Sequence, residues 1–116
     1  MKLDLKAKNI TLTEAISTFV DGKLASFDSK VKRYGDSVSA EMEVGMTSKH
    51  HKKGPIFRAE LHIRLPGKLV YAQAEDLNLY TAIIQAKREA EAQIAAFKSV
   101  HDKKMRTAKK TKGGRA

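Results

Sequence analysis

The segment from residue 74 to residue 105 is the feature that most constrains the fold of this chain. Its apolar residues recur with helical periodicity, which predicts one long amphipathic helix with a single buried face. The members of this apolar stripe are Leu79, Tyr80, Ile83, Ala86, Ala90, Ile94 and Phe97. Asp76 precedes the stripe, and its carboxylate is predicted to cap the helix by accepting from free backbone N–H groups.

The remaining sides of this predicted helix are rich in cations. They carry Lys87, Arg88, Lys98, Lys103 and Lys104. Glu91 follows Lys87 by four residues, as Asp102 follows Lys98, so one interpretation is a solvated face with ion pairs inside the helix. The other interpretation is a surface for a polyanionic partner, and the charge distribution of the whole chain favours it.

Net charge is the strongest property of the composition. The chain of 116 residues has 23 Lys and Arg against 13 Asp and Glu, a formal net charge of +10. Residues 98–116 hold eight of the cations and one Asp, so this segment alone contributes +7. Such a concentration of charge predicts a polyanionic partner. The segment has no Trp, Phe or Leu to insert into a membrane surface, so nucleic acid is the predicted partner.

The sequence contains no recognisable catalytic or cofactor-binding motif. It has no glycine-rich phosphate loop, no nucleophile elbow and no cysteine. The spacing of its four histidines, His50, His51, His62 and His101, is not that of convergent metal ligands. We therefore predict a protein that is not an enzyme, with no metal, no other cofactor and no small-molecule substrate. A signal-peptide pattern and an apolar run of roughly 20 residues are both missing, which predicts a cytoplasmic protein.

The rest of the chain alternates between strand and helix patterns. The alternation of apolar and polar residues predicts strands, and the capping-box pair Thr11 and Glu14 predicts the start of a first helix. The predicted elements are a strand at 2–8, a helix at 12–33, strands at 38–46, 57–65 and 68–75, and the long second helix. A basic loop is predicted at 47–55, and Pro66 and Gly67 predict a type II turn.

This order, β-α-β-β-β-α, predicts an α+β fold. Each strand and each helix has one apolar face, which favours a four-stranded, mainly antiparallel sheet with both helices packed on one face. That architecture is double-stranded-RNA-binding-domain-like, with an added first strand. Lys23, Lys30 and Arg33 lie along one side of the first helix, where we expect them to join the cations of the second helix. The predicted domain spans 1–105, and a basic flexible tail follows at 106–116.

The aromatic residues do not follow the pattern of a single-strand binder. Tyr71 falls in a strand and Tyr80 lies on the apolar side of the second helix, so base stacking is not predicted as the main mode of contact. Contacts from Lys and Arg to the phosphates of a folded nucleic acid are predicted instead.

Two segments, residues 3–31 and 59–83, carry a resemblance to a known family. Their matching positions are Asn9, Thr13, Ala15, Asp76, Tyr80, Ala82 and Ile83. In these motifs, and in the basic end of the second helix, the chain resembles the ribosome hibernation-promoting factor / ribosome-associated inhibitor family in its short form, of the sigma-54 modulation protein / S30EA type. The chain departs from the family pattern at Asn78, where Asp is usual, and at Ile84, where Asp or Asn is common.

The resemblance implies a ribosome hibernation factor that inhibits translation. Such a factor binds 16S rRNA, beside ribosomal proteins, in the mRNA and tRNA channel of the small ribosomal subunit. It keeps 70S ribosomes inactive under stress or in stationary phase. Long-form members carry a further C-terminal domain, for which a chain of this length has no room. The expected rRNA-binding residues are Lys23, Lys30, Arg33, Lys87, Arg88, Lys98, Lys103, Lys104 and Arg106.

Two other functions fit the same pattern of charge and elements. A double-stranded RNA-binding module would bind free duplex RNA as tightly as it binds ribosomes. A regulatory protein-interaction domain unrelated to the ribosome would keep its partner at high salt and after removal of the basic tail.

Overall fold

The computed structural model describes residues 1–51 and 54–113, with side chains described except at 36, 48–51 and 101–113. The order of elements is the predicted one. The elements are β1 (Lys2–Lys8), α1 (Glu14–Val31), a 3₁₀ helix (Lys32–Ser37), β2 (Ser39–His51), β3 (Gly54–Leu65), β4 (Lys68–Asp76) and α2 (Leu79–Gly113). The division at residue 105 into a domain and a tail stays a prediction, and the backbone of α2 continues to Gly113.

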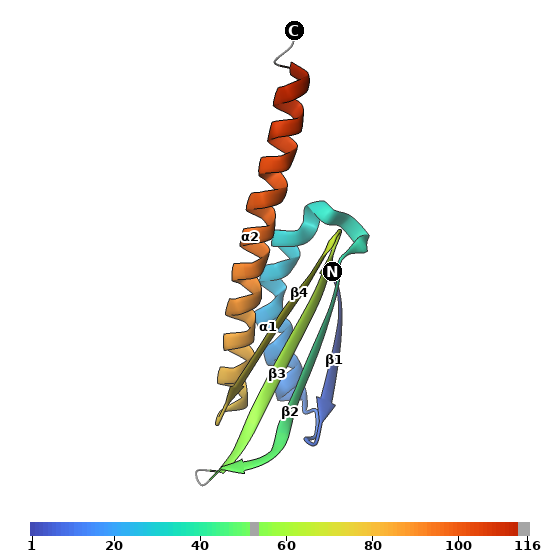
Figure 1. The fold of residues 1–116 in the computed structure, drawn as a ribbon. Coiled ribbons are helices and arrows are strands. Elements are labelled where there is room, and N and C mark those ends of the chain that lie inside the picture. Colours follow the sequence, from blue (N-terminus) through green and yellow to red (C-terminus); the bar gives the residue numbers. More distant parts are fainter. Residues whose placement is uncertain (52–53, 114–116) are drawn as a thin grey trace.

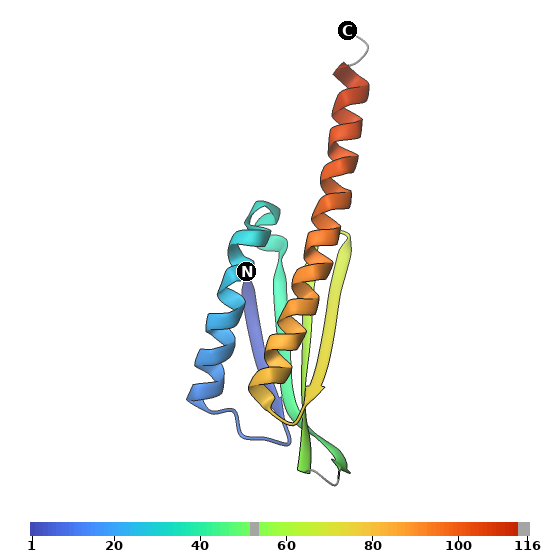
Figure 2. The same ribbon diagram turned by 90° about the vertical axis from the view of Figure 1, so that its left-hand side faces the viewer.

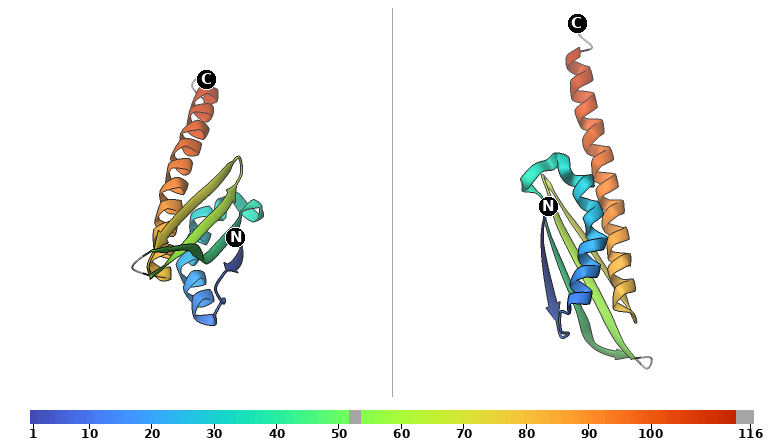
Figure 3. Two further views of the ribbon diagram at one scale, coloured as in Figure 1. Left: turned by 60° about the horizontal axis from the view of Figure 1, so that its bottom comes forward. Right: turned by 180° about the vertical axis from the view of Figure 1, so that it is seen from behind.

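The four strands form one mixed sheet in the order β1-β2-β3-β4. Strand β1 pairs in parallel with β2, and the other two pairings are antiparallel. Helix α1 connects the parallel pair, and both helices cover the same face of the sheet (Figures 1 and 2). The view from behind shows the two helices side by side in front of the strands (Figure 3). The predicted α+β fold with two helices on one face is therefore confirmed.

One apolar core lies between the helix layer and the sheet. Helix α1 contributes Ile16, Val20, Leu24, Phe27 and Val31, which are all buried, whereas Phe19 is only partly buried and Leu12, expected on the same face, is 38% exposed. Helix α2 buries most of its predicted stripe, from Leu79 to Ile94. Two members of the predicted stripe are not fully buried: Phe97 is half-buried and Tyr80 is 39% exposed. The prediction that Tyr80 is buried with the stripe is wrong, because its ring lies at the border of the stripe, against Phe19 of α1.

The caps of both helices differ from the predicted ones. Thr13, not Thr11, caps α1, and its Oγ1 accepts a hydrogen bond from the N–H of Ile16 at 3.2 Å. At the start of α2, the side chain of Asn78 accepts from the N–H groups of Tyr80 and Thr81. The carboxylate of Asp76 accepts instead from the N–H of Asn78 at 2.8 Å. Asn and Asp are equally good caps, which gives the family departure at Asn78 a structural role.

The hairpin of β2 and β3 is longer than predicted. The prediction of a loop over 47–55 is wrong at both ends, because β2 runs to His51 and β3 begins at Gly54. The register shifts between Met46 and His50, beyond the part of the sheet that the helices cover. The alternation of apolar and polar residues ends where the core ends, but the backbone hydrogen bonds between β2 and β3 need no apolar side chains and continue further. The hairpin therefore projects past the ends of β1 and β4 (Figure 1). Lys52 and Lys53 lie outside the described residues.

Gly45 permits the close approach of β1 and β2. It lies opposite Lys8, and a Cβ atom built on it would be 2.5 Å from the Lys8 carbonyl oxygen. We expect Gly45→Ala to lower the free energy of unfolding by about 1–3 kcal/mol in urea denaturation, because the backbone must shift. Gly22→Ala in α1 is the matched control, since its Cβ meets nothing within 4 Å, and it is expected to raise stability by up to about 1 kcal/mol. Equal effects of the two substitutions would contradict this account.

Candidate nucleic-acid interface

Helices α1 and α2 run in the same direction and meet in a constant register. Phe19 packs against Tyr80 with ring centroids 4.6 Å apart, and Lys30 Nζ lies 2.5 Å from Glu91 Oε2. Both pairs are 61 positions apart in the sequence, as expected for two parallel helices with the same rise per residue. The sides of the two helices that carry cations therefore face each other, and Figure 2 shows that both helices start at the same end of the molecule.

Glu91 joins the two cationic sides. Its carboxylate pairs with Lys30 of α1 and, at 3.6 Å, with Lys87 of its own helix. The hydrogen bond from Lys30, and the charges of both lysines, hold the pKa of Glu91 below its usual value. Two of the predicted rRNA-binding residues are thus brought together, but around a carboxylate. The group of three carries +1 rather than +2.

The three predicted cations of α1 and its C-terminal extension all lie near aromatic rings. Lys23 Nζ is 5.4 Å from the centroid of Phe19, Lys30 Nζ is 5.8 Å from Phe27, and Arg33 Cζ is 5.2 Å from Tyr34. At these distances the negative face of each ring attracts the cation. Each contact restricts a long side chain that would otherwise sample many rotamers, so the cations are directed along the helix surface before any ligand arrives.

The remaining predicted residues lie farther along α2. Arg88 is exposed and Lys98 is half-buried, and neither makes an ion pair within the described part of the chain. Lys103, Lys104 and Arg106 belong to the backbone of α2, but their side chains lie outside the described residues. The sequence therefore adds these three cations along the C-terminal part of α2.

The opposite, solvent-facing side of the sheet has a different charge distribution. Its residues form four rows across the strands: Lys8–Gly45–Arg58–Glu75, Lys6–Glu43–Glu60–Gln73, Asp4–Glu41–His62–Tyr71 and Lys2–Ser39–Arg64–Leu69. These rows contain five basic and five acidic side chains, so the open face has no net charge. The charge excess of the chain therefore lies elsewhere in the sequence. Residues 14–37 and 79–100 of the helix layer hold seven basic and six acidic residues, whereas residues 101–116 hold seven basic residues and one Asp.

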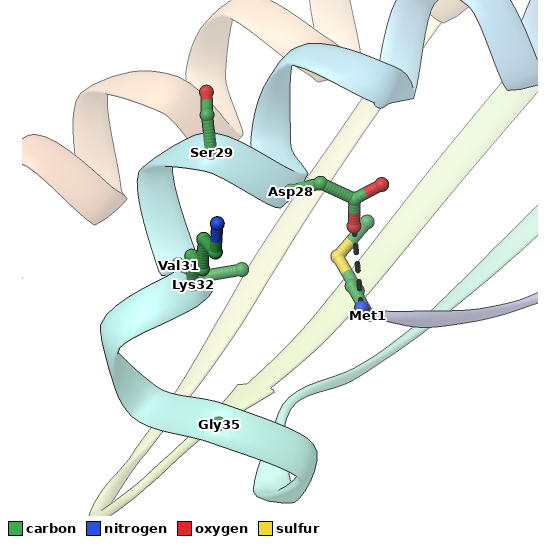
Figure 4. Close-up of a pocket in the computed structure, with 6 residues that line it drawn as sticks. All are labelled: Met1, Asp28, Ser29, Val31, Lys32 and Gly35. Carbon is green, nitrogen blue, oxygen red and sulfur yellow. Dashed lines mark ion pairs between the residues drawn. The ribbon is translucent and has the colours of Figure 1, made fainter.

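A hollow on the far side of α1 offers no alternative site. It is lined by Met1, Asp28, Ser29, Val31, Lys32 and Gly35. Asp28 is already paired there with the Met1 amino group at 3.2 Å (Figure 4). Its charged groups do not converge on a common point, and no cluster of three potential metal ligands occurs among the described residues.

Comparison with known proteins identifies the family. Residues 3–110 match the family described as Sigma 54 modulation protein / S30EA ribosomal protein. The chain belongs to this family. The S30EA family consists of non-enzymatic factors, which confirms the prediction that this chain is not an enzyme.

Individual relatives agree with this assignment. The chain is 27% identical over 110 residues to a ribosome hibernation promotion factor of Lactococcus lactis subsp. cremoris (strain MG1363), covering 93% of this chain but 55% of the relative. It thus spans about half the length of that curated relative. The crystal structure of the N-terminal domain of Thermus thermophilus Protein Y superposes with a TM-score of 0.66 at 34% identity, covering 84% of this chain and 99% of that domain. A ribosomal subunit interface protein from Coxiella burnetii shares the fold, with a TM-score of 0.69 at 16% identity over 85% of this chain and 99% of that one.

Sequence reasoning missed the role of Glu91 between the helices. The i,i+4 spacing from Lys87 signalled only a pair within one helix, whereas the contact to Lys30 depends on the packing of α1.

Among the described residues, neither helix contains a stretch apolar enough to cross a lipid bilayer.

The Glu91 bridge predicts a pH-dependent contribution to stability. Because the folded state lowers the pKa of Glu91, its stabilisation is complete above the usual value of 4.5 and is lost as the pH falls through the lower, folded-state pKa. We expect Glu91→Gln to lower the free energy of unfolding at pH 7 and to match the wild type at strongly acidic pH. Urea denaturation at a series of pH values measures this difference. Glu89→Gln on the same helix is the control, and a Glu89 effect with the same pH dependence would overturn the assignment.

Proposed function

We propose that this protein is a ribosome hibernation factor that binds 16S rRNA in the mRNA and tRNA channel of the small ribosomal subunit. The observation that carries the proposal is the parallel packing of α1 and α2, which brings Lys30 of one helix and Lys87 of the other around Glu91, whereas the open sheet face has no net charge. The names of two relatives, a ribosome hibernation promotion factor and a ribosomal subunit interface protein, support the same partner.

The proposed contact is between the helix layer and rRNA phosphates. Lys23, Lys30 and Arg33 approach the backbone from the α1 side, and Lys87, Arg88 and Lys98 from α2. Lys103, Lys104 and Arg106 extend the contact along the same helix. Phosphate contacts fix the position of a protein without reading sequence, which suits a factor that recognises one large folded RNA by its shape.

The proposed mechanism is steric. A protein held in the channel by several phosphate contacts excludes mRNA and the initiator tRNA, because both need the same space. No chemical step is required, in agreement with a family of non-enzymatic factors. Under stress or in stationary phase, occupation of the channel would keep 70S ribosomes inactive in the cytoplasm until the factor dissociates.

Co-sedimentation with isolated subunits and 70S ribosomes tests the partner. We expect the protein to pellet with small subunits, and we expect mRNA together with initiator tRNA to reduce the amount bound. Free duplex RNA at equal concentration should not remove it. Removal by duplex RNA would indicate a general double-stranded RNA-binding module, and binding that is unaffected by high salt would indicate a protein partner.

Neutralising two cations of the helix layer tests the interface. Arg88→Gln combined with Lys98→Gln is expected to weaken binding to small subunits and to reduce the slope of log K against log salt concentration by about two, one for each lost phosphate contact. Arg64→Gln combined with Lys68→Gln removes the same charge near the open sheet face and is expected to leave the slope unchanged. Filter binding at several salt concentrations gives both slopes. Equal losses in the two variants would rule out the helix layer as the rRNA-binding surface.

A further inference from the structure

The starts of α1 and α2 carry an aromatic and apolar surface that phosphate contacts do not explain. Tyr80 at the start of α2 is 39% exposed. Leu12 and Leu77, each two residues before a helix begins, are 38% and 49% exposed. Because the two helices start at the same end of the molecule (Figure 2), these side chains belong to one end of the helix layer. An exposed aromatic ring next to cations is typical of sites that contact nucleobases.

Tyr80 is 39% exposed, and its ring packs edge-to-face against Phe19. Its ring and that of Phe19 are 79° apart at a centroid distance of 4.6 Å. In a perpendicular pair neither ring covers both faces of the other, so each keeps a face that its partner does not contact. Lys23 lies one turn along α1 from Phe19, with its Nζ 5.4 Å from the Phe19 centroid. The exposed Tyr80 ring and the Lys23 ammonium group therefore both lie against Phe19.

The other two tyrosines do not offer the same combination. The Tyr71 hydroxyl donates to Gln73 at 2.6 Å on the open sheet face, and Glu60 lies 3.4 Å away. Tyr34 is half-buried, with its ring 5.7 Å from that of Phe97. The hydroxyl of Tyr80, by contrast, makes no hydrogen bond to any residue that the structure describes. Of the three, Tyr80 alone combines an exposed ring with a position on the cationic helix layer.

We propose that Tyr80, supported by Phe19 and Lys23, is a stacking site for an unpaired RNA base. The base lies on the tyrosine ring, and the phosphate beside it contacts the ammonium group of Lys23. Since every base has a π-face, the site selects an unpaired nucleotide rather than a sequence. This inference rests on the proposed function and deepens it, because an unpaired nucleotide beside a folded backbone distinguishes rRNA from uninterrupted duplex RNA.

A tryptophan at position 80 reports stacking directly. The chain contains no Trp, so Tyr80→Trp in the full-length protein introduces a single indole fluorophore. We expect its emission to be quenched when isolated small ribosomal subunits are added, because a stacked nucleobase quenches indole. Tyr71→Trp is the matched control, since Tyr71 is 40% exposed on the opposite face of the sheet, and its emission should stay constant. Unchanged emission from Tyr80→Trp in the bound complex, or equal quenching in both variants, would overturn the stacking site.

A pair of substitutions separates stacking from packing. Tyr80→Phe keeps the ring and should bind small subunits like the wild type, whereas Tyr80→Leu keeps an apolar side chain without a π-face and should bind about tenfold more weakly. Urea denaturation of each variant shows whether the fold is retained. Wild-type affinity of a folded Tyr80→Leu variant would contradict the stacking site alone. Wild-type affinity and salt slope in the Arg88 and Lys98 double variant would instead contradict the proposed function.

Discussion

The side-by-side packing of α1 and α2 over one face of the sheet is the constraint on which the surface of this protein depends. Each helix buries one apolar stripe, and the parallel register at a separation of 61 positions brings the cationic side of one against the cationic side of the other. Like charges brought this close repel each other. Glu91 offsets the repulsion by pairing with Lys30 and Lys87, and aromatic rings hold the cations of α1. The two cation-bearing sides can therefore pack together because Glu91 reduces the repulsion between their charges.

The open face of the sheet, in contrast, carries equal numbers of acidic and basic side chains. This face alternates acidic and basic residues across four strands, with pairs such as Lys6 and Glu41 at 3.1 Å. Arg58 donates to both Glu60 and Gln73. A net charge of +10 spread evenly over the molecule would attract polyanions in any orientation. In this chain the excess lies mainly in residues 47–55 and 101–116, which hold ten basic residues and one acidic residue. Concentrating the charge in two segments favours a defined orientation toward a phosphate backbone.

Periodicity made the fold predictable, but it could not identify contacts between elements. The strands at the sheet centre and the buried faces of both helices follow from apolar spacing, since each must be covered by another layer. The extension of the hairpin through 47–51 did not follow, because backbone pairing beyond the core needs no apolar pattern. Thr11 and Thr13 have the same capping chemistry, and only the path of the chain after Asn9, which adopts a positive φ of 62°, selects between them. The exposure of Tyr80 depends on how α1 lies beside α2, which no single segment encodes.

Directed hydroxyl-radical probing of the bound complex tests the orientation of the helix layer most directly. The chain has no cysteine, so an iron chelate can be tethered at one engineered residue: Ala95→Cys, exposed on α2, or Leu69→Cys, exposed on the open sheet face. The account predicts strong cleavage of 16S rRNA along the mRNA and tRNA channel from position 95, and markedly weaker cleavage from position 69. Stronger cleavage from position 69, or cleavage confined to rRNA outside the channel, would contradict it.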